Sequence, residues 1–171
     1  MKTTLHASVL ATALSCAASA QTARFVGESL VIADGPRRIR LPPVIKPHPI
    51  ARCVHAVQKR SGEYFILIGG SEWSRGYPPR GGLCGSGVEE YIEWLHVRNG
   101  KIIETQKGLY LSCWDGRSGV PPAWQDGQLR WGVVYVWIDE GAGHAEQISW
   151  TYDPRAPRKG IQEQKKTIPK Q

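Results

Sequence analysis

Three kinds of pattern are missing from this chain, and each absence narrows the class of protein. Past residue 20, the longest apolar run is residues 133–138, far short of the ~20 residues that a membrane-spanning helix requires. No window shows the 3.6-residue apolar period of an amphipathic helix. No stretch has the spacing of a nucleophile elbow or of a zinc site. We therefore expect no membrane span, no metal or other cofactor, and a fold without long helices.

The first 20 residues have the composition of a secretory signal peptide. Lys2 supplies a positive start, the segment that follows is mainly apolar or small, and Ala18-Ser19-Ala20 has the form of a cleavage site. We expect residues 1–20 to be removed and the remaining chain to be periplasmic or secreted. Cys16 follows a weak version of a bacterial lipoprotein box, so lipid anchoring at this residue is the less favoured alternative.

The formal net charge of +7 is concentrated near the end of the sequence. Residues 155–171 contain six Lys or Arg and one Glu, which leaves residues 21–154 nearly neutral. This composition predicts a disordered basic tail over residues 155–171 that either keeps the protein soluble or contacts anionic surfaces. A nearly neutral core argues against nucleic acid as its partner.

Short segments with alternating apolar and polar residues follow one another through residues 21–154. Residues 146–152 alternate strictly, and residues 129–138 form a second strand that we expect to pair with them in antiparallel fashion. Further strands are expected at residues 25–33, 39–41, 54–59, 64–69, 91–98, 101–105 and 109–114. The pattern predicts a single all-β domain over residues 21–154, arranged as an antiparallel β-sandwich or a barrel-like fold.

The dipeptide Asn99-Gly100 predicts a two-residue type I′ hairpin turn, because both central positions of this turn have positive φ. The expected register sets Arg98 opposite Lys101, Val97 opposite Ile102, His96 opposite Ile103 and Trp94 opposite Thr105. In this register His96 and Glu104 lie on opposite faces of the hairpin, whereas Glu93 and Glu104 share a face.

Acid–base chemistry is the enzyme function with the best candidates. Two carboxylates on one face can hydrolyse a glycosidic bond, which singles out Glu93 and Glu104, and His96 is the candidate general base. A solvated polar face for the two glutamates, and for His96 a core histidine bonded to a backbone group, explain the same residues more simply. Ser86, in a Gly-rich stretch, lacks the spacing of a serine nucleophile. We therefore expect no catalytic residues and no enzyme.

Three cysteines remain after residue 20, and an oxidising compartment favours one disulfide among them. We favour Cys84–Cys113, which leaves Cys53 as a small buried side chain. A Cys53–Cys84 bridge would close a loop of similar length, so the entropy of loop closure does not decide between the two pairings.

The most suggestive segment for binding is the loop from Trp73 to Ser86. Long irregular loops in compact domains are usually functional or disordered, and Trp, Tyr and Arg dominate the energetics of protein interfaces. The expected contact residues of this loop are Trp73, Arg75, Tyr77, Arg80 and Ser86. A disulfide at Cys84 would anchor the end of the loop and lower its ordering cost on binding.

Gly85-Ser86-Gly87, followed by Glu90-Tyr91, resembles the loop of the periplasmic lysozyme inhibitors, which are small exported β-barrels. The resemblance covers only these few residues, and the basic residue that the family usually has before the tyrosine is absent. What it implies is a class of protein, a small exported inhibitor.

The favoured function is that of an exported, non-enzymatic β-domain that binds another macromolecule, as an inhibitor, an immunity protein or an envelope-associated protein. A protein partner is expected ahead of a glycan. The first alternative is a carbohydrate- or peptidoglycan-binding module with Trp73, Tyr77 and Trp124 as stacking platforms, and the second is a small secreted glycosidase or nuclease.

Overall fold

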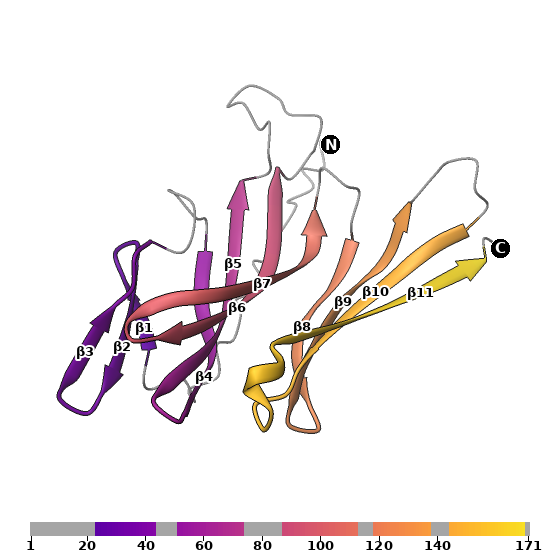
Figure 1. Cartoon of the computed structure of the whole chain (residues 1–171). Coiled ribbons are helices and arrows are strands. Elements are labelled where there is room, and N and C mark those ends of the chain that lie inside the picture. The colour runs from indigo at the N-terminus through magenta and orange to yellow at the C-terminus, as the bar shows by residue number, and fades with distance from the viewer. Residues whose placement is uncertain (1–22, 44–50, 74–86, 113–117, 138–143, 170–171) are drawn as a thin grey trace, which may run out of the picture.

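The computed structural model describes residues 23–43, 51–73, 87–112, 118–137 and 144–169, and it shows an all-β fold built from three antiparallel sheets (Figure 1). Sheet A consists of β1 (Ala23–Val26), β2 (Ser29–Asp34) and β3 (Arg37–Arg40). Sheet B consists of β4 (Ala51–Arg60), β5 (Glu63–Trp73), β6 (Val88–Arg98) and β7 (Lys101–Ser112). Sheet C consists of β8 (Ser118–Gln125), β9 (Gln128–Trp137), β10 (His144–Tyr152) and β11 (Ile161–Pro169). The predicted all-β class is confirmed.

Each sheet is a meander of strands that are consecutive in the sequence, and the three sheets form layers with sheet B in the middle (Figure 1). One core lies between sheets A and B and includes Leu30, Ile32, Ile66, Leu95 and Val97. A second core lies between sheets B and C and includes Phe65, Trp94, Trp131, Trp150 and Tyr152. Sheet B therefore has a core on both of its faces.

The sequence of β5 is nearly continuously apolar because this strand is buried on both of its faces. Successive side chains of a strand point to opposite faces. Ile66 and Ile68 accordingly belong to the first core, whereas Phe65 and Leu67 belong to the second, and all four are fully buried. A strand covered on both faces has no position for an exposed polar side chain, so the period-2 pattern disappears.

The predicted hairpin at Asn99-Gly100 is present, with φ angles of 51° and 73° at these two residues. Arg98 pairs with Lys101 and Val97 with Ile102, as predicted. A register shift between His96 and Val97 then sets His96 opposite Glu104 and Trp94 opposite Gln106, so the predicted register is wrong beyond this point. A β-bulge adds one residue to one strand, and this reverses the faces of all side chains that follow.

Two other predicted strands have different limits in the structure, and one strand was not predicted. Residues 25–33 are not one strand but the β1–β2 hairpin, and residues 109–112 continue β7 instead of forming a separate strand. Strand β8 was not predicted, because Pro121-Pro122 interrupts its pattern, and the structure shows a register shift between Val120 and Ala123 at this place. The predicted antiparallel pairing of residues 129–138 with 146–152 is confirmed.

The expected disordered tail needs a correction, since most of it is ordered. A short 3₁₀ helix (Pro157–Lys159) is followed by β11, which pairs with β10 from Tyr152–Ile161 to His144–Pro169. The backbone groups along the edge of β10 supply hydrogen bonds that do not depend on side-chain composition. A charged, Lys-rich strand at the edge of a sheet is a common protection against edge-to-edge aggregation.

Within the residues described, no helix has both the length and the apolar character needed to cross a membrane. The expected signal peptide and Cys16 lie outside the described residues.

Candidate functional site

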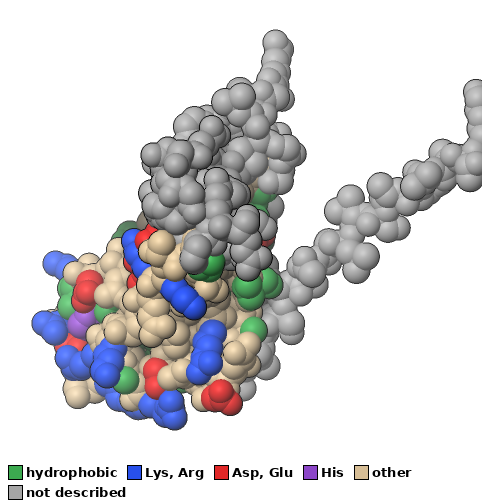
Figure 2. Space-filling view, turned by 90° about the vertical axis from the view of Figure 1, so that its right-hand side faces the viewer, with side chains coloured by type: hydrophobic (Ala, Val, Ile, Leu, Met, Phe, Trp, Pro, Cys, Tyr) green, Lys and Arg blue, Asp and Glu red, His purple; other side chains and the backbone are tan. Residues whose placement is uncertain are grey.

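A concave surface lies on the face of sheet C that points away from sheet B. On β10, Ile148, Trp150 and Tyr152 are buried in the second core, so the alternating residues Ser149 and Thr151 lie on the outer face. Viewed from this side, the described residues present mainly uncharged polar and backbone surface, with Lys and Arg side chains and fewer acidic and hydrophobic ones among it (Figure 2). A groove of about 550 Å³ runs over this face.

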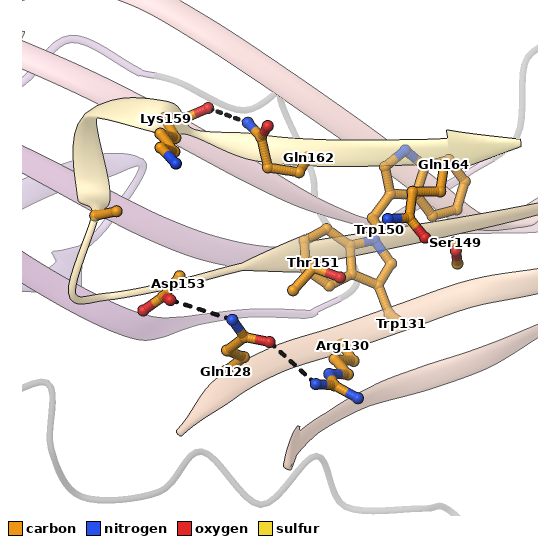
Figure 3. Close-up of a pocket in the computed structure, with 11 residues that line it drawn as sticks. Gln128, Arg130, Trp131, Ser149, Trp150, Thr151, Asp153, Lys159, Gln162 and Gln164 are labelled. Carbon is orange, nitrogen blue, oxygen red and sulfur yellow. Dashed lines mark hydrogen bonds between the residues drawn. The ribbon is translucent and has the colours of Figure 1, made fainter. Parts of the chain in front are cut away.

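The groove exists because short side chains on β10 lie between longer ones on its two neighbouring strands (Figure 3). Ser149 pairs with Gln164 of β11, and Thr151 pairs with Gln162 of β11 and Arg130 of β9. Ser149 and Thr151 thus form the floor, and the Gln and Arg side chains form the two walls. Asp153, Ala156 and Lys159, from the turn between β10 and β11, line the same groove beyond the end of β10.

A chain of hydrogen bonds holds the polar side chains at this end. Arg155 donates to both oxygens of Asp153, with Nη2 2.8 Å from Oδ2, and Gln128 Nε2 donates to Oδ2 at 3.1 Å. Gln128 Oε1 in turn accepts from Arg130 Nη2 at 3.1 Å. The bonds from Arg155, followed by that from Gln128, keep the pKa of Asp153 far below its usual range. These bonds favour the charged form of Asp153, so its carboxyl group is a poor proton donor.

Two tryptophans lie at the base of the groove. Trp131 and Trp150 are each 3% exposed and stack on each other with their ring centroids 6.3 Å apart. They belong to the core between sheets B and C, so they support the groove and do not offer a ring face to a ligand. Recognition in the groove therefore depends on amide, hydroxyl and cationic groups.

The turn that lines the groove is fastened to sheet B by three side chains. Trp94 Nε1 donates to the carbonyl oxygen of Pro157 at 3.1 Å, and Gln106 Oε1 accepts from the backbone N–H of Ile161 at 2.7 Å. Glu63 forms an ion pair with Arg158 at 3.0 Å. The position of the turn, and of Asp153 and Lys159 on it, thus depends on contacts between two sheets.

His96 belongs to this fastening cluster. Its Nε2 lies 3.0 Å from Glu63 Oε2, its Nδ1 lies 3.9 Å from Glu104 Oε2, and its ring stacks on Phe65 at 4.6 Å. The hydrogen bonds from His96 and then Arg98, with the charge of Arg158, lower the pKa of Glu63. The expectation that His96 and Glu104 lie on opposite faces is wrong because of the bulge beside His96. The imidazole is buried, as the core-histidine interpretation predicted, but the partner of its Nε2 is the Glu63 carboxylate and not the expected backbone group.

A second polar cluster, partly buried, lies on the sheet A side of sheet B. Lys107 Nζ is 3.0 Å from Glu72 Oε1 and 3.4 Å from the ring centroid of Tyr91, and Lys107 pairs with Glu93 across the strands. Burial raises the pKa of Glu93 to about 7, and the charge of Glu72 adds to the effect while that of Lys107 opposes it. Glu93 and Glu104 do not share a face, because the bulge turns Glu104 to the side of His96, so this pair cannot act together.

Cys53 and His55 form a third polar pair at an edge of sheet B. Cys53 Sγ is 3.4 Å from His55 Nε2, and a β-bulge between Val54 and Ala56 adds His55 to the strand. Gly69 makes room for the ring, since a Cβ there would lie 2.5 Å from Nε2. Burial lowers the pKa of His55 to about 4, so the imidazole is neutral at pH 7. Cys84 and Cys113 lie outside the described residues, and the Cys84–Cys113 disulfide stays a prediction.

Of the loop residues expected to bind a partner, only Trp73 lies within the described part of the chain. It is the last residue of β5 and 48% exposed. Arg75, Tyr77, Arg80 and Ser86 fall outside it. Trp124, at the β8 end of sheet C, is 40% exposed. Neither of these tryptophans lines the groove.

The groove was not predicted from the sequence. The alternation of residues 146–152 identified its floor as the polar face of a strand, but the walls come from β9 and from the segment expected to be disordered. Within the described residues, no group of three or more His, Cys, Asp or Glu is placed to hold a metal ion.

Comparison with known proteins identifies no relative: no protein-family model matches the chain, and neither the curated proteins nor the solved structures include a significant match.

Proposed function

We propose that this protein is a non-catalytic binding domain whose ligand is an oligosaccharide held in the groove of sheet C. The observation that carries the proposal is the chemistry of the lining. Gln162, Gln164, Ser149 and Thr151 each offer both hydrogen-bond donors and acceptors, which complements the hydroxyl and acetamido groups of sugars. They also project from paired strands, so little order has to be gained on binding.

The charges at the groove support binding more than hydrolysis. Glycosidases use two carboxyl groups on either side of the scissile bond, one of them with a raised pKa. Among the described residues that line the groove, Asp153 is the single carboxylate, and its hydrogen bonds to Arg155 and Gln128 lower its pKa. The one carboxyl group described with a pKa raised to about 7, Glu93, lies on the sheet A side of sheet B.

A glycan array probed with the wild-type chain and with Ser149→Trp tests the proposal. The larger side chain fills the floor of the groove, so we expect the wild type to retain a defined set of glycans and the variant to lose all of them. Lys165→Trp is the matched control, because this exposed residue lies on the same sheet but on the opposite face from Gln164. Equal glycan binding by Ser149→Trp and the wild type would rule out the groove as the site.

A second candidate function, a protein partner bound at the end of sheet B, is supported by the exposure of Trp73. Large aromatic side chains that are half exposed are typical anchors of protein interfaces, and Trp73 begins the segment with Arg75, Tyr77, Arg80 and Ser86. Affinity capture with Trp73→Ala and Trp124→Ala compares two tryptophans of similar exposure, 48% and 40%. A partner that is lost only with Trp73→Ala supports this function, and one that both variants retain contradicts it. In either function, the expected export would bring the domain to ligands outside the cytoplasm.

A further inference from the structure

Two cationic side chains line the groove and favour a particular class of ligand. Arg130 lines the groove from β9 and Lys159 lines it from the turn, with Thr151 between them (Figure 3). The side chain of Arg130 is 46% exposed, and Lys159 is exposed as well. Both cationic side chains are therefore accessible to a ligand in the groove.

The opposing negative charge at the groove is already neutralised. Asp153 forms an ion pair with Arg155 at 2.8 Å. Arg130 comes within 3.9 Å of Asp126, but the Asp126 side chain is 88% exposed, so this ion pair is weak. The ion pairs found among the described residues include none for Lys159. The groove thus has a positive balance in a surface of otherwise uncharged groups.

We propose that the groove selects saccharides that carry a carboxylate, with Arg130 and Lys159 binding the carboxylate while the amide and hydroxyl groups bind the sugar. This inference rests on the proposed function and specifies its ligand. The guanidinium of Arg130 presents a planar fork that matches a carboxylate, and the bond from Arg130 to Gln128 Oε1 at 3.1 Å limits its motion. Lys159, on the turn fastened to sheet B, supplies a second cation as a point charge.

Two pairs of probes test the inference by changing only the acid group. The disaccharide of N-acetylglucosamine and N-acetylmuramic acid is compared with the methyl ester of its lactyl carboxylate. Trigalacturonic acid is compared with its methyl ester, which distinguishes a carboxylate on the ring from one on a side arm. With calorimetry at constant ionic strength, we expect the acidic member of at least one pair to bind about tenfold more tightly.

Charge-removing variants assign the preference to residues. Arg130→Gln and Lys159→Gln should each lower the affinity for the acidic member more than the affinity for the neutral member, and the two changes together should abolish the preference. Lys101→Gln, at an exposed hairpin position of sheet B, controls for the general charge of the protein and should have no effect.

The outcomes separate this inference from the function on which it rests. Equal affinity for both members of each pair, or binding of neutral array glycans with no binding of either acidic probe, overturns the carboxylate preference and leaves glycan binding intact. A preference that survives in the double variant overturns the assignment to Arg130 and Lys159. The absence of binding to every array glycan and every probe overturns both proposals.

Discussion

Sheets B and C follow the same rule of alternation but use it for different purposes. In sheet B, alternation separates two cores, and both faces of β5 are buried. In sheet C, alternation separates a core from the surface, and the outer face of β10 carries Ser149 and Thr151. Polar side chains inside sheet B must therefore bond to one another, whereas those on sheet C are available to a ligand.

The ionisable groups show the same difference. In sheet B, burial raises the pKa of Glu93 to about 7 and lowers that of His55 to about 4, since burial penalises the charged form in each case. At the groove of sheet C, hydrogen bonds from Arg155 lower the pKa of Asp153 instead, because a cationic partner stabilises the charged form of a carboxyl group. Sheet B is organised for internal packing, and sheet C offers its outer face to the solution.

The largest expected difference between the two sheets is in their tolerance of truncation to alanine. Phe65→Ala in β5 removes a fully buried ring that contacts Trp94 and His96, and it should lower the free energy of unfolding by about 3–5 kcal/mol. Thr151→Ala on the outer face of sheet C should change it by less than about 0.5 kcal/mol. Urea unfolding of both variants measures this, and similar losses would contradict the comparison.

A smaller effect is expected from filling space in sheet B. A Cβ at Gly70 would lie 2.5 Å from the Tyr91 hydroxyl, and Tyr91 is 1% exposed. Because the ring has no free space into which it can move, Gly70→Ala should lower the free energy of unfolding by about 1–3 kcal/mol. Thermal unfolding beside the control Ser149→Ala tests this, and an unchanged midpoint would show that sheet B is less tightly packed than described.

The partly buried carboxyl group of Glu93 predicts a pH dependence that comes from sheet B. Glu93 has a folded-state pKa of about 7 against an ordinary value of 4.5, so the folded protein holds its proton more tightly. The contribution of Glu93 is most favourable below pH 4.5 and decreases as the pH rises through 7. From pH 5 to pH 8 we expect a loss of about 1–2 kcal/mol, after allowing for its partial exposure.

Urea unfolding of the wild type and Glu93→Gln at several pH values measures this contribution as the difference between the two profiles. His55 acts in the opposite direction, because its lowered pKa removes stability as the pH falls toward 4. Both proteins contain His55, so its effect cancels when one profile is subtracted from the other. Glu104→Gln, on an exposed part of β7, should retain the wild-type profile. Parallel profiles for the wild type and Glu93→Gln would show that Glu93 is not buried.

The smallest effect is expected from the hydrogen bond between Gln106 of sheet B and Ile161 of sheet C. Gln106→Ala removes the acceptor of the Ile161 N–H and should lower stability by about 0.5–1.5 kcal/mol. Hydrogen exchange should become faster at Ile161 and along the start of β11, while the β4–β5 hairpin is unaffected. Fast exchange over all of residues 161–168 in the wild type would instead support the tail that composition predicts.

Local patterns predicted local structure well. The Asn99-Gly100 turn, the first pairs of its hairpin, the pairing of β9 with β10 and the buried side of β10 are all present. Each depends on residues close together in the sequence, where turn chemistry and period-2 alternation are the main determinants.

The errors have a different origin. The bulge beside His96 adds a residue without changing the apolar pattern enough to be seen, and it reversed the relation of His96 to Glu104 and of Glu104 to Glu93. The segment from Arg155 onward has the composition of a disordered tail, which is also that of an edge strand, and only pairing with β10 distinguishes the two. The exposed Trp73 was predicted as a surface residue, but the groove was not predicted.

The amino-acid sequence by itself determined the all-β class, the main hairpin and the polar face of β10, because these follow from the alternation of side chains along single strands. The tertiary structure alone decided the order of the three layers, the bonding of His96 and the groove. The walls of the groove come from β9, from β11 and from a turn that Trp94, Gln106 and Glu63 fasten to another sheet. Such a site depends on contacts between distant segments, and no local pattern encodes them.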